Sequence, residues 1–191
     1  MKLNKIKGIC KKRNTVYLYE RHDGSQLISD GAGFWPVTGD LRLSEEALRT
    51  IFEIPNKLWN GSWRHEHVIF GEDPCNENLA HLLDEVWEAS AEVQMEPVNG
   101  RVEVNGCVFK AFRADDGLTV FVPDAQLETV TDDARYYMLR QTGGPFKALA
   151  VYDSLLMCGL VGVADADTAA MIRGQCADWG NSSGGVTNGR P

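Results

Sequence analysis

The sequence predicts an α+β fold with a mostly antiparallel sheet of hairpins and three or four helices. Apolar residues recur at helical spacing in some segments, whereas other segments are β-branched or aromatic and end at turn dipeptides. Three such dipeptides follow one another closely: Asn99-Gly100, Asn105-Gly106 and Asp116-Gly117. The 191 residues, 43% hydrophobic and 24% charged, have ordinary globular composition. We expect one domain over residues 1–179, or two similar halves of about 1–90 and 91–179.

The first expected element is a helix over residues 2–12. Its apolar positions recur three or four residues apart, at Leu3, Ile6, Ile9 and Cys10. Three segments rich in β-branched and aromatic residues, separated by Asp-Gly turns, follow it and predict a three-stranded meander. These segments are residues 15–20, 26–29 and 33–37.

A second helix is expected over residues 45–53. Ser44 is suited to cap its free amides, two glutamates follow at the positive end of the helix dipole, and Pro55 ends it. We then expect a loop over 56–62 and a strand over 63–70. A third helix is expected over 76–89, because Asp73-Pro74 resembles a helix start and leucines and Trp87 share one face.

The C-terminal half is predicted to consist mainly of hairpins. A meander is expected in four strands, at residues 93–98, 101–104, 107–113 and 118–122. A short helix, a strand, a hairpin about Asp153-Ser154 and a closing helix follow, at residues 123–130, 136–140, 146–163 and 165–177. The run 155–163 is almost wholly apolar, which favours burial on both faces or self-association. Residues 180–191 contain one apolar side chain and are expected to be a disordered tail.

Charge is distributed unevenly along the chain. There are 19 Lys and Arg against 27 Asp and Glu, a net charge of -8. Six bases nevertheless lie in the first thirteen residues, with no acid: Lys2, Lys5, Lys7, Lys11, Lys12 and Arg13. An acidic body disfavours uniform coating of nucleic acid, whereas a local basic strip can contact phosphates. Lys5, Lys12 and Arg13 are the candidate nucleic-acid-binding residues; the alternative, and the more frequent case, is a solvated helix face.

Cysteine usage and hydropathy point to a soluble cytoplasmic protein. The five cysteines are an odd number with no Cys-x-x-Cys pair, so we expect reduced thiols rather than disulfides or a zinc ribbon. No run approaches about 18 apolar residues, so no membrane association is expected. The two common phosphate-binding glycine loops are absent from the sequence, and we expect no cofactor.

Two alternatives to a non-catalytic protein remain open. His65 and His67 alternate on one predicted strand, and Cys75 and His81 follow in the next fourteen residues. These residue types can bind zinc, so the first alternative is a metal-dependent hydrolase that uses His65, His67 and His81. The spacing matches no recognised zinc motif, so exposed strand histidines are the simpler interpretation and no metal site is assigned. Gly180–Gly184 matches the serine-hydrolase pattern but lies in the polar tail, where no strand-to-helix elbow is expected.

The second alternative is a small-ligand or sugar-binding module using Trp59 and Trp63. These indoles flank a Gly-Ser loop, a position that would leave them partly exposed as an aromatic platform. Packing of the loop onto the sheet is favoured instead, because an indole buries a large apolar area.

Two segments resemble known proteins. The helix over 3–12, the strand 15–20 and the strand 26–29 resemble the opening of a DNA sliding-clamp subdomain, and the hairpin 146–163 is similar to its closing hairpin. The sequences of residues 28–31 and 35–37 resemble those of prophage-associated proteins of Firmicutes. The clamp resemblance implies DNA tethering without catalysis. The leading hypothesis is therefore a non-catalytic interaction or tethering protein of phage origin, with a protein partner or self-association and DNA contact through the N-terminal helix.

Overall fold

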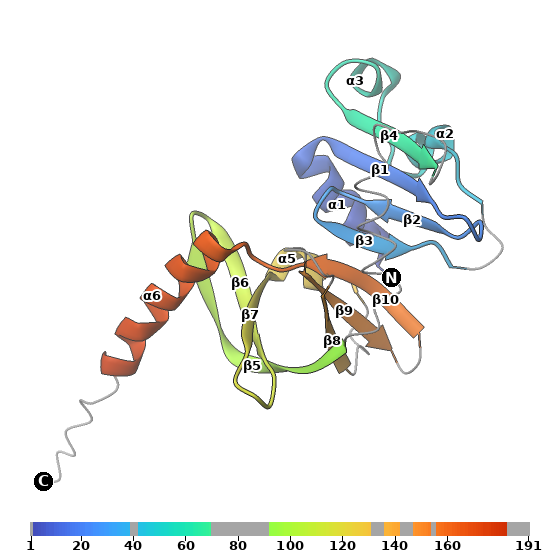
Figure 1. Cartoon of the computed structure of the whole chain (residues 1–191). Helices are drawn as coiled ribbons and strands as arrows, with labels where there is room; N and C mark the ends of the chain where they lie inside the picture. Colours follow the sequence, from blue (N-terminus) through green and yellow to red (C-terminus); the bar gives the residue numbers. More distant parts are fainter. Residues whose placement is uncertain are drawn as a thin grey trace, which may run out of the picture.

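A computed structural model describes residues 2–38, 42–69, 92–130, 136–141, 147–153 and 156–182. They form two lobes (Figure 1). The first lobe contains α1 (Leu3–Arg13), β1 (Thr15–Glu20), β2 (Gln26–Ser29), β3 (Gly33–Pro36), α2 (Glu45–Ile51), α3 (Asn56–Trp59) and β4 (Arg64–Ile69). The second contains β5 (Glu92–Val104), β6 (Cys107–Arg113), β7 (Thr119–Pro123), α5 (Asp124–Leu127), β8 (Tyr136–Gln141), β9 (Lys147–Asp153), β10 (Leu156–Gly162) and α6 (Ala166–Ser182).

One ten-stranded sheet runs through both lobes in the order β4-β1-β2-β3-β10-β9-β8-β5-β6-β7. Every pairing is antiparallel except that of β1 with β4, which aligns Thr15 with Arg64 and Glu20 with Ile69. The expected α+β fold with a mostly antiparallel sheet is confirmed, whereas the described residues contain five helices instead of the expected three or four. The parallel pair is a departure from the expected hairpins, and it arises because two helices separate β4 from β3 in the chain.

Helices cover one face of the first lobe. The core on that face combines strand residues such as Leu18 and Trp35 with helix residues, and all of its members are buried. The helix side chains in this core are Ile6 and Cys10 of α1, Leu48 of α2 and Trp59 of α3. The opposite face, with Tyr19 and Phe34, packs in a cluster that includes Ala150 and Leu160 of the second lobe.

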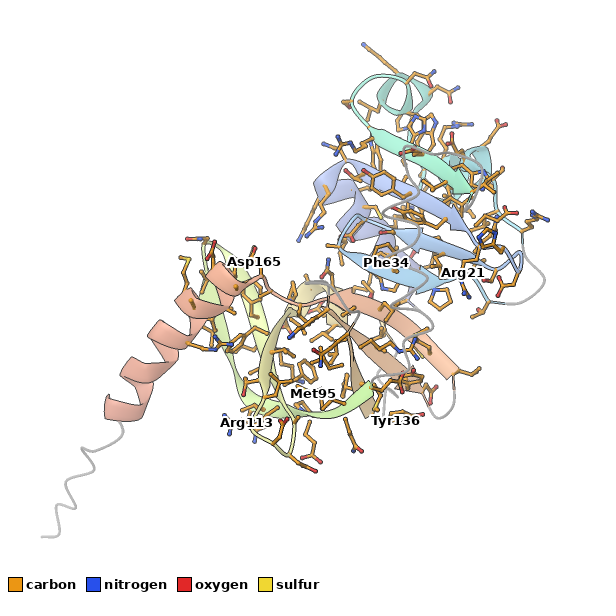
Figure 2. All side chains as sticks on the ribbon, viewed as in Figure 1. Arg21, Phe34, Met95, Arg113, Tyr136 and Asp165 are labelled. Carbon is orange, nitrogen blue, oxygen red and sulfur yellow. The ribbon has the colours of Figure 1, made fainter. Side chains whose placement is uncertain are left out.

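The second lobe curls into a barrel-like shape around its own core (Figures 1 and 2). Two meanders, β5-β6-β7 and β8-β9-β10, are joined by pairing of β5 with β8. The Ala164 N–H donates to the Phe121 carbonyl at 2.8 Å, which ties the chain after β10 to β7. All six strands contribute buried side chains to the interior, among them Met95, Phe112, Val122, Leu139, Leu149 and Val161.

The lobes meet where β3 pairs with β10, at Phe34 with Leu160 and Gly33 with Val161. Trp35 is fully buried there, and its Nε1–H donates to Thr129 Oγ1 at 2.5 Å. A Cβ at Gly33 would lie 2.7 Å from Trp35 Cζ2, so glycine is required by the close approach of the indole.

Most of the N-terminal expectations are confirmed. The helix expected over 2–12 and the meander expected over 15–37 are observed, and the helix expected over 45–53 is α2. Ser44 caps α2 by accepting a hydrogen bond from the Ala47 N–H at 3.2 Å. Asn105 and Gly106 have φ values of 51° and 74°, which confirms their hairpin turn.

Two expectations are wrong. Residues 93–98 and 101–104 are not separate strands around a turn but parts of the single strand β5, whose pairing with β6 shifts between Pro97 and Arg101. The Asn99-Gly100 pair lies in this bulge, because three residues of β5 face one of β6. The expected loop 56–62 begins with the short helix α3, whose first carbonyl acceptor is that of Pro55.

The closing helix is longer than expected. It is α6, which extends to Ser182 and is capped by Asp165, whose Oδ1 accepts from the Thr168 N–H at 2.7 Å. The helix expected over 76–89 and residues 183–191 of the expected tail lie outside the described residues. Within the described ranges, no helix combines the length and apolar character needed to cross a bilayer.

Candidate functional site

Helix α1 carries the three predicted nucleic-acid-binding residues. Ile6 and Cys10 are fully buried and fix the helix against the first-lobe sheet. The first turn has no acidic residue, and the last turn ends in Lys11, Lys12 and Arg13. Bases at this end also interact favourably with the helix dipole, so a purely structural role accounts for part of the pattern.

Lys5 forms an ion pair with the second lobe. Its Nζ lies 2.9 Å from Glu128 Oε2, and the two side chains are 55% and 52% exposed. The hydrogen bond from Lys5 holds the pKa of Glu128 below its usual value. An exposed pair of this kind contributes about 0–1 kcal/mol, so Lys5 can exchange its partner at little cost.

Arg13 makes a different kind of contact. Its Nη1 lies 3.2 Å from Asp30 Oδ2, and the Asp30 side chain is fully buried while that of Arg13 is 46% exposed. Asp30 Oδ1 also accepts from the Ala32 and Gly33 N–H groups at 3.0 and 2.8 Å. Gln126 Nε2 approaches Asp30 Oδ2 at 3.4 Å. Arg13 therefore anchors the end of α1 to the β2–β3 turn, and Asp30 in turn connects that turn to Gln126 of α5.

Lys12 differs from both, because it makes no ion pair with a described residue. Both Lys11 and Lys12 are exposed, and neither has an ion-pair partner within the part of the chain that the structure describes. The structure thus places all three predicted residues on one helix but gives them different surroundings. Lys5 is weakly paired, Arg13 is fixed by a buried carboxylate, and Lys12 is exposed with no ion-pair partner among the described residues.

The predicted histidine pair lies on β4, but each histidine contacts a different carboxylate. His65 Nδ1 is 3.3 Å from Glu45 Oε2, and His67 Nε2 is 3.4 Å from Glu20 Oε2. Neither contact has the alignment of a hydrogen bond. Across the described residues, no group of three His, Cys, Asp or Glu side chains is arranged to hold a metal ion. Cys75 and His81 lie outside them.

Glu20 is the centre of the polar cluster beside His67. Gln26 Nε2 donates to Glu20 Oε2 at 3.1 Å, and Arg42 pairs with Glu20 Oε1. Burial alone would raise the pKa of Glu20, but the Gln26 hydrogen bond and the Arg42 charge outweigh it and lower that pKa. Glu20 is consequently an ionised structural acceptor.

Trp59 and Trp63 do not present open ring faces. They are 7% and 9% exposed. Trp59 stacks on His65 with ring centroids 3.9 Å apart and on Trp63 at 6.4 Å. The loop packs onto the sheet, as favoured from the sequence.

Three carboxylates that organise these sites were not singled out from the sequence. Asp30 sits in Ser29-Asp30-Gly31, where its local signal is only that of a turn residue. Glu20 and Glu45 lie on elements far in sequence from the histidines they contact. The Glu20–His67 contact depends on the parallel β1–β4 pairing, and the Glu45–His65 contact depends on the packing of α2 against β4. The sequence carries no local signal for either arrangement.

Comparison with protein-family models, with curated proteins and with solved structures finds no match to this chain. The function proposed below rests on the sequence and geometry of the chain itself.

Proposed function

We propose that this is a non-catalytic interaction protein that contacts the phosphate backbone of DNA through Lys5, Lys12 and Arg13 of α1. The observation that carries the proposal is the exposed position of Lys12, without an ion-pair partner among the described residues. It lies on a helix held rigidly by Ile6 and Cys10. A rigid, locally basic helix end is suited to phosphate contact.

The surroundings of the other two bases are compatible with this role. The Lys5–Glu128 pair is half exposed, so a phosphate can replace Glu128 at small cost. The guanidinium of Arg13 has five N–H donors. The ion pair with Asp30 orients this group, but the Arg13 side chain stays 46% exposed and accessible to a phosphate.

DNA is chosen among polyanions because α1, β1 and β2 follow the element order that resembles a sliding-clamp subdomain. The proposal includes that the protein tethers to DNA without catalysis and that it is encoded by a phage. A net charge of -8 opposes long-range attraction, so the binding should be weak and sensitive to salt.

The test is fluorescence anisotropy with a labelled duplex of about 20 bp. With three phosphate contacts, affinity should fall about 40-fold between about 50 and 200 mM salt, and the Kd near physiological salt should be about 10⁻⁴–10⁻⁶ M. Lys12→Ala should weaken binding and flatten the salt dependence by about one contact. Lys5→Ala combined with Lys12→Ala should weaken it further.

Lys57→Ala is the matched control, because Lys57 is also an exposed helical lysine of the first lobe. It should leave the affinity unchanged. Loss of affinity in this control equal to that of Lys12→Ala would show diffuse charge attraction instead of a site on α1. Absence of binding at the lower salt concentration would overturn the proposal.

A further inference from the structure

A cavity of about 260 Å³ lies at the junction of the two lobes. The β2–β3 turn and Phe34 form one side, while Phe109, Pro123 and Val163 form another. The wall is completed by the start of α6 near Asp165 and Thr168. Figure 2 shows Phe34 on the first lobe and Asp165 where α6 begins. Junctions of this kind are common positions for small-molecule sites.

Gln126 of α5 also lines this cavity and is only 1% exposed. Its Nε2 approaches Asp30 Oδ2 at 3.4 Å, which sets the orientation of the amide. Its Oε1 has no hydrogen-bond partner in the described part of the protein. Buried acceptors are nearly always satisfied, so this oxygen calls for a donor that the described residues do not supply.

Several backbone donors in the described wall of the cavity already have acceptors. The Ala32 and Gly33 N–H groups donate to Asp30 Oδ1, and the Gly162 N–H donates to the Ala32 carbonyl. The Thr168 N–H donates to Asp165 Oδ1. A molecule bound in the cavity is then the candidate donor for Gln126 Oε1.

We propose that this cavity binds a small, neutral, mainly apolar molecule whose single N–H or O–H group donates to Gln126 Oε1. The aromatic and aliphatic wall suits the apolar part of such a molecule. An anion is disfavoured, because the carboxylates of Asp30 and Asp165 flank the site. None of the three proposed DNA-contact residues lines the cavity, although Arg13 and Gln126 share the acceptor Asp30 Oδ2.

The test uses three pairs of probes that differ by one methyl group on the donor atom. They are indole and 1-methylindole, phenol and anisole, and cyclohexanol and methoxycyclohexane. Binding to the full chain is followed by amide chemical shifts of Ala32, Val163 and Thr168. For at least one pair, the donor-bearing probe should bind about 2- to 10-fold more tightly, which corresponds to one net hydrogen bond.

Two variants test whether the probe occupies the cavity and whether its donor group contacts Gln126. Gln126→Met should remove the preference for the donor-bearing probe while retaining apolar binding. Ala32→Leu adds bulk at another position in the cavity wall, keeps the Gln126 amide and should abolish binding of both members of a pair. Ala166→Leu is its control, because Ala166 borders a neighbouring cavity and not this one.

The outcomes are distinct. A donor preference that disappears in Gln126→Met supports the proposal. Equal binding of both probes in every pair would show that Oε1 is satisfied by water alone and would overturn it. So would the absence of shifts at the three amides with all six probes, or unchanged binding in Ala32→Leu.

Discussion

Replacing Asp30 by asparagine should destabilise the protein strongly, because the Asp30 side chain is fully buried and paired with Arg13. The asparagine carbonyl can still accept from the Ala32 and Gly33 N–H groups. Its amide nitrogen would then face the Arg13 guanidinium and the Gln126 amide nitrogen, so three donors would converge where a buried charge was paired. Breaking a buried pair costs about 3–5 kcal/mol, and the half-exposed Arg13 reduces this to about 2–3 kcal/mol.

Urea denaturation followed by tryptophan fluorescence measures this loss, since Trp35, Trp59 and Trp63 are buried. With a slope of about 1–3 kcal/mol per molar urea, the midpoint of Asp30→Asn should fall by about 0.7–3 M. Asp116→Asn is the control, because Asp116 is an exposed turn carboxylate that accepts from the Leu118 N–H, as asparagine also can. Asp116→Asn should stay within about 0.5 kcal/mol of the parent. A change equally small in Asp30→Asn would refute the role given to the Arg13–Asp30 pair.

Three further predictions concern packing, pH and thiol chemistry. Gly33→Ala should lower stability by about 1–3 kcal/mol in thermal denaturation, because its Cβ would meet the buried Trp35 ring at 2.7 Å; a neutral effect would contradict this packing. The lowered pKa of Glu20 stabilises the fold above the unfolded-state pKa of about 4.3, and this contribution is lost as the pH falls through the folded-state pKa. Urea midpoints at about pH 6 and pH 3 should therefore differ less in Glu20→Gln, and an unchanged difference would contradict the assignment. Cys107 is exposed and should react with iodoacetamide in the folded protein, whereas burial raises the pKa of Cys10 and should protect it; mass spectrometry showing equal labelling would contradict this.

Local signals in the sequence were sufficient for many elements. Ser44 followed by two glutamates predicts the start of α2, because a capping hydroxyl and the helix dipole act within one turn. Asn105-Gly106 predicts its hairpin, because both residues adopt positive φ. These features depend on neighbours only a few residues away.

Features that depend on distant partners were not predicted. The same Asn-Gly signal at residues 99–100 lies in a bulge of β5, because pairing with β6 continues on both sides of it. The parallel contact of β4 with β1 joins segments about fifty residues apart in the chain. Local periodicity contains no information about either pairing.

The candidate site was predicted as a helix but not as a set of contacts. The basic character of α1 is visible in the sequence, whereas the pairing of Lys5 with Glu128 and of Arg13 with Asp30 depends on how α5 and the β2–β3 turn pack against that helix. The cavity at Gln126 has the same origin, because its walls come from both lobes. The sequence around Gln126, one polar residue on a four-residue helix, does not indicate that this residue lines a cavity.

The most direct test of the proposed DNA contact is an amide chemical-shift map of the full chain titrated with a short duplex at low salt. The proposal predicts that the amides of Lys11, Lys12 and Arg13 shift together, while those of the β6–β7 hairpin in the second lobe stay in place. Shifts confined to the second lobe, or none at saturating duplex, would contradict a phosphate contact at the end of α1.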